Sequence, residues 1–198
     1  MITYPEIQES IQNAMSYETY KKLVSAMISK GLSTGAEQSE ALSNYTILNE
    51  RRMQRWDKVL KISDPVREKI ESFQGNVTWL VLTESWCGDA AHAIPVIGKL
   101  ASLNKGITFK LVLRDENDAL MQRYLTNGGR AIPKLLVIDN TTAEVMNTWG
   151  PRPSTATRMV DEFKKEYGAL TPEFKKELQL WYNKDKGQTI ARDLSELL

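Results

Sequence analysis

Cys87 is the residue in this sequence best suited to chemistry. It is the only cysteine among 198 residues, so no disulfide can form within the chain. It lies in the segment Glu84-Ser85-Trp86-Cys87-Gly88-Asp89-Ala90, between a short apolar run and a helical pattern. A thiol at the start of a helix faces unpaired backbone N–H groups, which favour the thiolate that attacks disulfides. We therefore predict a nucleophilic, partly exposed Cys87 with a lowered pKa; the alternative is a structural cysteine buried among apolar side chains.

Charged neighbours modify what this thiol can do. The carboxylate of Asp89 suits the start of a helix, but its negative charge disfavours a nearby thiolate. Glu84, Asp89 and one cysteine make a poor ligand set for zinc, so we expect no metal site. The single histidine, His92, lies about 140° around the helix from Cys87, and we expect it at the surface.

An alternation of strand and helix patterns surrounds the cysteine. The run over 77–83 is rich in apolar, β-branched and aromatic residues, which is typical of a central strand covered on both faces. Further strands are predicted over 107–113, 135–138 and 144–149. Helices are predicted over 89–102, 118–125 and 154–167. This order places the chain in the α/β class.

Helical patterns extend beyond both ends of this region. Helices are predicted over 17–29 and 39–62, followed by a short one with Asp64 as its N-cap and Pro65 at its first position. Thr171 and Pro172 predict another helix start, and a final short helix is predicted after Gly187. Because no low-complexity linker separates these parts, we expect both helical ends to pack on the core. The predicted division is an N-terminal extension over 1–75, a central domain over 76–168 and a C-terminal extension over 169–198.

Several landmarks of the central domain resemble those of the thioredoxin-like superfamily. Trp86-Cys87-Gly88-Asp89-Ala90 resembles the family motif Trp-Cys-Gly-Pro-Cys, and Pro95 matches the helix proline that follows it. Arg130-Ala131-Ile132-Pro133-Lys134 resembles the family's cis-proline segment, and Gly150 matches the glycine that ends the last strand. The resemblance implies a thioredoxin-like fold, in which a mixed sheet of four or more strands is flanked by helices. It also implies a cis Ile132–Pro133 bond opposite Cys87.

The departures from the family pattern concern the second half of its redox chemistry. Ala90 occupies the place of the second, resolving cysteine, and Asp89 that of the motif proline. Val81 replaces the family's buried aspartate, and Leu111 replaces the lysine that faces it. These losses agree with one another and favour a natural monothiol lineage. An engineered replacement of cysteine by alanine is the alternative.

The resemblance implies monothiol thiol–disulfide exchange through Cys87. A second thiol must then come from glutathione, another low-molecular-weight thiol or another protein, and the partner is a protein or a small disulfide. No resident cofactor is expected. The residues expected to bind the substrate are Trp86, Gly88, Asp89, Ile132 and Pro133. Two alternatives stay open: a binding module that uses the groove around Trp86 and Pro133 without turnover, and a sensor that reports oxidation of Cys87.

The composition of the chain predicts its type of partner and its location in the cell. The formal net charge of +1 indicates neither nucleic acid nor an anionic membrane as a partner. No apolar run approaches the roughly 18 residues that a membrane span requires. The first residues lack the basic and apolar regions of a signal peptide, and the single cysteine suits a reducing compartment. We therefore expect a cytoplasmic protein.

Overall fold

The computed structural model describes residues 5–198 and has an α/β architecture built on one four-stranded sheet. The strand order is β2-β1-β3-β4. Strand β1 pairs in parallel with β2 and antiparallel with β3, which in turn pairs antiparallel with β4. The strands are β1 (Val77–Thr83), β2 (Ile107–Leu113), β3 (Lys134–Asp139) and β4 (Val145–Trp149). The predicted class and the mixed sheet are thus confirmed.

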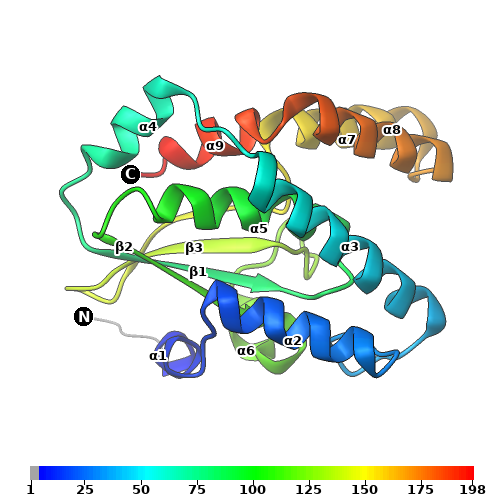
Figure 1. Ribbon diagram of the computed structural model, residues 1–198, viewed down its shortest axis with the longest axis horizontal. Coiled ribbons are helices and arrows are strands. Elements are labelled where there is room, and N and C mark those ends of the chain that lie inside the picture. The colour runs from blue at the N-terminus through cyan, green and yellow to red at the C-terminus, as the bar shows by residue number, and fades with distance from the viewer. Residues whose placement is uncertain (1–4) are drawn as a thin grey trace.

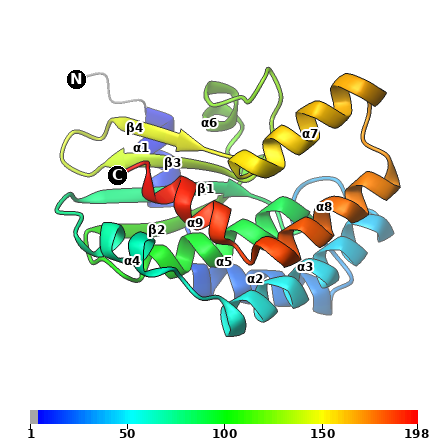
Figure 2. The ribbon, with the colours of Figure 1, turned by 90° about the horizontal axis from the view of Figure 1, so that it is seen from above.

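Helices cover both faces of this sheet (Figures 1 and 2). On one face lie α4 (Asp64–Glu71), α5 (Gly88–Ala101), α7 (Ser154–Tyr167), α8 (Pro172–Asp185) and α9 (Gln188–Ser195). On the other lie α1 (Pro5–Gln12), α2 (Tyr17–Ser29) and α6 (Asp118–Arg123). The long helix α3 (Glu40–Val59) runs beside α2 and α5, and a 3-10 turn (Arg114–Glu116) follows β2.

The central strand β1 explains why both faces need cover. All seven of its residues are buried. Val77, Trp79 and Val81 join the core cluster that contains residues of α5, α7, α8 and α9. Leu80 and Leu82 join a second cluster with residues of α1, α2 and α6. This two-sided burial accounts for the nearly continuous apolar run, because successive side chains of a strand point to opposite faces.

Local signals define several helix starts. The side chains of Ser16, Ser39 and Thr171 accept hydrogen bonds from backbone N–H groups in the first turns of α2, α3 and α8. The N-cap of α4 is Ser63, so the prediction that Asp64 caps this helix is wrong by one residue. Asp64 instead occupies the first turn, where a carboxylate also favours the helix. Within residues 5–198, no helix combines the length and the apolar character needed to cross a membrane.

Candidate functional site

Cys87 lies between the end of β1 and the start of α5, where it forms the N-cap of the helix. Its thiol donates a hydrogen bond to the carbonyl oxygen of Ile132 at 3.3 Å. The Ile132–Pro133 peptide bond is cis and directly precedes β3. The structure therefore brings together three of the residues singled out in the sequence, Cys87, Ile132 and Pro133, from segments 45 residues apart.

The environment of the Cys87 thiol differs from the prediction. The residue is only 9% exposed, and burial raises its pKa from 9.0 to about 12. The nearby carboxylate of Asp89 adds to this rise, whereas the backbone N–H groups of Ala90 and Asp89 and the charge of Arg152 oppose it. The expected lowering of the pKa is wrong, because loss of hydration outweighs the favourable field of the helix start.

Asp89 connects this site to the C-terminal part of the chain. Its carboxylate pairs with the guanidinium of Arg152 at 2.8 Å and accepts a hydrogen bond from the hydroxyl of Tyr182 at 2.9 Å. Burial raises the pKa of Asp89, and the charge of Arg152 opposes that rise. The carboxylate at the motif's proline position is therefore held by α8 and by the segment that follows β4.

Trp86 and Gly88 flank the cysteine in different surroundings. Trp86 is partly exposed, and the guanidinium of Arg114 lies over its ring, 4.9 Å from the centroid. Gly88 faces α3: a Cβ atom at this position would lie 3.4 Å from the Arg52 guanidinium. Each of the two residues that flank Cys87 in the sequence therefore has an arginine guanidinium as a neighbour.

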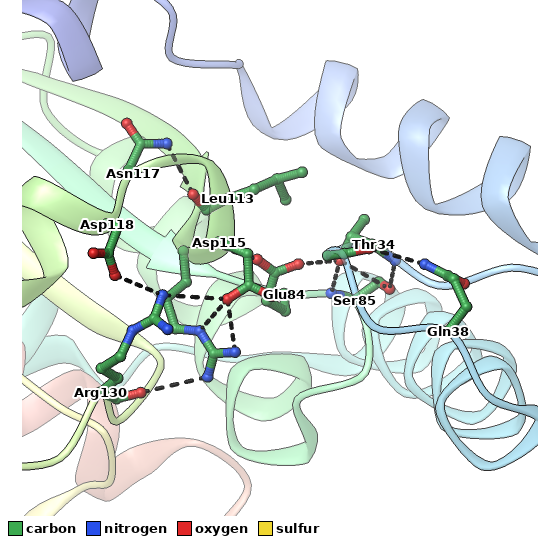
Figure 3. A network of polar contacts seen from close by, with 11 residues as sticks. Thr34, Gln38, Glu84, Ser85, Leu113, Asp115, Asn117, Asp118 and Arg130 are labelled. Carbon is green, nitrogen blue, oxygen red and sulfur yellow. Dashed lines mark hydrogen bonds and ion pairs between the residues drawn. The ribbon is translucent and has the colours of Figure 1, made fainter.

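The segment before Cys87 is bound by the N-terminal extension (Figure 3). Glu84 is fully buried, and one of its carboxylate oxygens accepts a hydrogen bond from the Thr34 hydroxyl. The same hydroxyl accepts a hydrogen bond from the Ser85 backbone N–H at 2.8 Å, and the Thr34 N–H donates to the Ser85 hydroxyl at 3.0 Å. In helix α3, the Asn49 side-chain amide donates a hydrogen bond to the Ser85 carbonyl oxygen, and the hydroxyls of Thr46 and Ser85 share a hydrogen bond. The segment is therefore held in place by residues far away in the sequence.

The second carboxylate oxygen of Glu84 leads to a cluster of charges after β2. It accepts a hydrogen bond from the Asp115 backbone N–H at 2.9 Å. The Asp115 side chain pairs with Arg114 and Arg130, and Arg130 also pairs with Asp118 (Figure 3). This cluster ties the loop before Pro133 to the same region that holds the segment before Cys87.

His92 is buried, so the prediction of a surface histidine is wrong. It is 3% exposed, and its ring stacks on Tyr182 with centroids 4.3 Å apart. Its Nδ1 accepts a hydrogen bond from the Trp56 indole at 3.0 Å, and its Nε2 lies 2.9 Å from the Gln179 side-chain oxygen. Burial lowers its pKa to about 4, so the ring is neutral at pH 7. The prediction considered α5 alone, but α3 and α8 cover this face of the helix.

The positions expected to carry the family's buried aspartate and lysine are apolar and adjacent. Val81 and Leu111 are partners in the register of β1 and β2, and both are fully buried. This pair of positions therefore carries no charged group that could assist proton transfer to a resolving thiol. Within residues 5–198, no group of three His, Cys, Asp or Glu side chains is arranged to hold a metal ion.

Sequence reasoning missed several residues that contact the site. Thr34, Arg152 and Tyr182 come from distant segments and stand in no recognisable motif. Arg52 is the second of two consecutive arginines in the pattern that predicts a helix over 39–62, and such a pair is typical of a solvated helix face. In the structure it lies beside Gly88, and burial lowers its pKa. Only tertiary packing brings these side chains to the residues around Cys87.

Comparisons with known proteins agree with this geometry. A family model described as Thioredoxin matches residues 35–164, a range that contains α3 and α4 as well as the sheet. A crystal structure of a protein of unknown function from Pseudomonas aeruginosa has a TM-score of 0.59 and 16% sequence identity, covering 92% of this chain and 96% of that one. An HIV epitope scaffold has a TM-score of 0.56 and 16% identity, with 92% and 97% covered. No curated protein matches the chain. The two structures support the fold and carry no information on activity.

Proposed function

The chain belongs to the thioredoxin family, and from this premise we propose that it performs monothiol thiol–disulfide exchange through Cys87. The observation that carries the proposal is the position of the sole cysteine. Cys87 is the N-cap of α5, and its sulfur lies 3.3 Å from the Ile132 carbonyl oxygen, which belongs to the cis Ile132–Pro133 peptide bond. A thiol placed this way faces the backbone segment that an extended substrate would pair with.

The proposed exchange runs in two steps. The Cys87 thiolate attacks a disulfide R–S–S–R′, the Cys87–S–S–R bond forms, and R′–S⁻ leaves and takes a proton from water. An external low-molecular-weight thiolate, G–S⁻, then attacks the R sulfur. R–S–S–G forms, and the Cys87 thiolate is released. Because Ala90 is not a thiol, the chain itself cannot perform this second attack.

The neighbouring residues have separate roles in this proposal. The backbone of Ile132 would pair with the substrate beside Pro133, while Trp86 supplies an apolar edge next to the sulfur. The N–H groups of Asp89 and Ala90 stabilise the thiolate as it forms. The second thiol comes from glutathione, another low-molecular-weight thiol or another protein. Glutathione is abundant in reducing compartments, which is consistent with the proposed cytoplasmic location.

The raised pKa sets the expected pH dependence. With a pKa of about 12, Cys87 is almost entirely protonated at pH 7, and the thiolate fraction rises about tenfold per pH unit. The rate of mixed-disulfide formation should therefore increase from pH 7 to pH 11 without a plateau near 9. Substrate binding that left the thiol partly hydrated would speed the reaction at lower pH.

The test measures mixed-disulfide formation by mass spectrometry. The protein is incubated with bis(2-hydroxyethyl) disulfide between pH 7 and pH 11, and reduced glutathione is then added to release the adduct. We expect one adduct on Cys87 and none on the Cys87→Ser variant. Absence of the adduct even at pH 11 would contradict the proposal. Because there is no resolving thiol, insulin should not be reduced through a thioredoxin-reductase relay.

A binding module without turnover is the second candidate, favoured by the burial of the thiol. At 9% exposure and with a pKa of about 12, Cys87 also fits a packed residue beneath a peptide groove. The same experiment separates the two functions. An inert Cys87 in a stably folded chain would indicate the binding module.

A further inference from the structure

A cationic groove lies at the start of α5, next to the segment that contains Cys87. Its volume is about 490 Å³, within the range of roughly 300–1,000 Å³ typical of small-molecule sites. Gly88 and Asp89, the two residues that follow the cysteine, form one wall. Helix α3 and helix α8 form much of the rest. The groove thus exists only because the two helical extensions meet over the start of α5.

The charges in this groove are unbalanced. The groove is lined by one carboxylate, that of Asp89, and by four cationic side chains. The cations are Arg52, Arg152, Lys175 and Lys176. Asp89 is already shared between Arg152 and Tyr182. Among residues 5–198, no carboxylate forms an ion pair with Arg52, Lys175 or Lys176. The groove therefore presents unpaired positive charge to a ligand.

Two further features distinguish the groove from an ordinary solvated, charged surface. The Nε–H of Arg152 is buried without a hydrogen-bond partner in the described part of the chain, although another guanidinium nitrogen pairs with Asp89. Arg52 is half-buried, and loss of hydration lowers its pKa. Partly desolvated guanidinium groups bind carboxylates more strongly than fully hydrated ones. Tyr45 and Leu178 add an aromatic and an apolar surface beside them.

The cations come from three separate elements. Arg52 belongs to α3, Arg152 to the segment after β4, and both lysines to α8. A ligand with acidic groups at both ends would meet cations on different sides of the groove, whereas a single small anion would use only part of it. Arg152 is also close enough to Cys87 to lower its pKa, which places the groove within electrostatic reach of the thiol.

We infer that this groove binds a low-molecular-weight thiol carrying more than one carboxylate, and that it orients this thiol toward the mixed disulfide on Cys87. The inference rests on the proposed function, because it assigns a site to the external thiol that the exchange requires. The carboxylates pair with the arginines and the α8 lysines, and the thiol sulfur extends past Gly88. Exchange with glutathione is therefore faster than exchange with an uncharged thiol of equal reactivity.

The test measures binding separately from chemistry. Titration of the full chain with S-methylglutathione, which keeps both carboxylates but cannot exchange, should give saturable binding that weakens with added NaCl. Lys175→Glu/Lys176→Glu should bind at least tenfold more weakly, and Arg52→Gln should also bind less well. The matched control is Lys164→Glu/Lys165→Glu, an exposed pair on α7 outside the groove, which should bind as the wild type does. Thermal unfolding of each variant verifies that it is folded.

Other outcomes of these experiments would contradict either the groove assignment or the proposed function. Undetectable binding, or equal binding by the groove variant, overturns the inference. Displacement of S-methylglutathione by inorganic phosphate at equal concentration, but not by NaCl of equal ionic strength, would show a general anion site and also overturn it. Mixed-disulfide formation on Cys87 without binding of S-methylglutathione would leave the proposed function standing and the groove assignment refuted. If S-methylglutathione still binds to Cys87→Ser and the wild-type thiol is inert, the groove binds the ligand but the proposed thiol–disulfide exchange is refuted.

Discussion

The thiol of Cys87 is subject to two opposed physical effects of different size. The start of α5 favours an anion by about 0.3–1 kcal/mol, and by up to about 2 kcal/mol in a partly buried position. The rise of the pKa from 9.0 to about 12 corresponds to roughly 4 kcal/mol against the thiolate. Burial therefore decides the protonation state of the free protein. A bound partner has to change the hydration or the charge around the sulfur before attack is fast at pH 7.

Asp89→Asn should make Cys87 more reactive. The Asp89 carboxylate is the main charge that raises the pKa of the thiol, and asparagine removes it while keeping the shape of the side chain. The amide oxygen can still accept the hydrogen bond from Tyr182. We expect alkylation by iodoacetamide at pH 8 to be about three- to tenfold faster than in the wild type.

The control for this prediction is Asp118→Asn. The Asp118 carboxylate is 60% exposed and pairs with Arg130 rather than with groups at the thiol. Its alkylation rate should equal that of the wild type. If the Asp89 variant also matches the wild type across pH 7–11, Asp89 has no electrostatic role at Cys87.

At the scale of elements, the loop between α2 and α3 carries the contact that holds the segment before Cys87. Thr34 is 3% exposed and uses one hydroxyl as donor to Glu84 and as acceptor from the Ser85 backbone. Glu84 is fully buried, so the hydroxyl compensates part of the cost of removing a carboxylate from water. Burial raises the pKa of Glu84 in spite of this contact.

Thr34→Val should destabilise the protein by about 2–4 kcal/mol, because it leaves the buried Glu84 carboxylate and the Ser85 N–H without their hydroxyl partner. Urea unfolding followed by circular dichroism measures this change. Thr108→Val provides the matched control, since Thr108 is exposed in β2, and it should shift stability by less than about 0.5 kcal/mol. Similar unfolding midpoints for the two variants would refute the structural role of Thr34.

His92 should make folding sensitive to mild acid. Its pKa is about 4 in the folded protein and 6.5 when unperturbed, so the unfolded chain binds more protons between these values. Stability linked to His92 is fully present above pH 6.5 and is lost as the pH falls toward 4, by about 3 kcal/mol in all. His92→Gln keeps an acceptor for the Trp56 indole and removes this titration.

The measurement for His92 is the free energy of unfolding from pH 7 to pH 4 for both proteins. The difference between the two curves isolates His92 from carboxyl groups such as Glu84 and Asp89, whose raised pKa values act in the opposite direction. We expect the wild type to lose stability relative to His92→Gln as the pH falls. A constant difference would show that the ring is not buried in neutral form.

At the scale of the whole molecule, helix α9 joins parts that lie far apart in the sequence. Ile190, Ala191 and Leu194 are at most 1% exposed and belong to the core cluster on the α5 face of the sheet. The carboxylate of Asp193 accepts hydrogen bonds from the backbone N–H and the hydroxyl of Ser154, at the start of α7. Glu196 pairs with Lys69 of α4 at 2.8 Å.

Removal of residues 188–198 should therefore destabilise the entire fold. Loss of the buried Ile190 and Leu194 side chains alone corresponds to about 3–6 kcal/mol, a large part of the roughly 5–15 kcal/mol typical of a domain. We expect a lower urea midpoint and a single transition. Leu180→Ala, at an exposed position of α8, serves as the control and should unfold close to the wild type. A truncated chain with the wild-type midpoint would show that α9 is dispensable.

Much of the central fold follows from local patterns. Neighbouring residues encode the apolar run of β1, the helix starts at Ser39 and Thr171, and the strands β3 and β4. The sequence therefore predicted these elements with small shifts of their ends. The division into an extension over 1–75, a domain over 76–168 and a second extension remains a prediction. The family match begins at residue 35, before the predicted domain boundary.

Residue identity and local periodicity are enough to predict the α/β class, and the sequence shows directly the single cysteine and the alanine at position 90. Tertiary structure alone decided the protonation of Cys87, the burial of His92 and the cationic groove. A pKa depends on hydration and on charges within a few ångströms, and here both are set by residues up to 93 positions away, as between Asp89 and Tyr182. No pattern along the chain records such distances, because they arise only when α3 and α8 pack against α5.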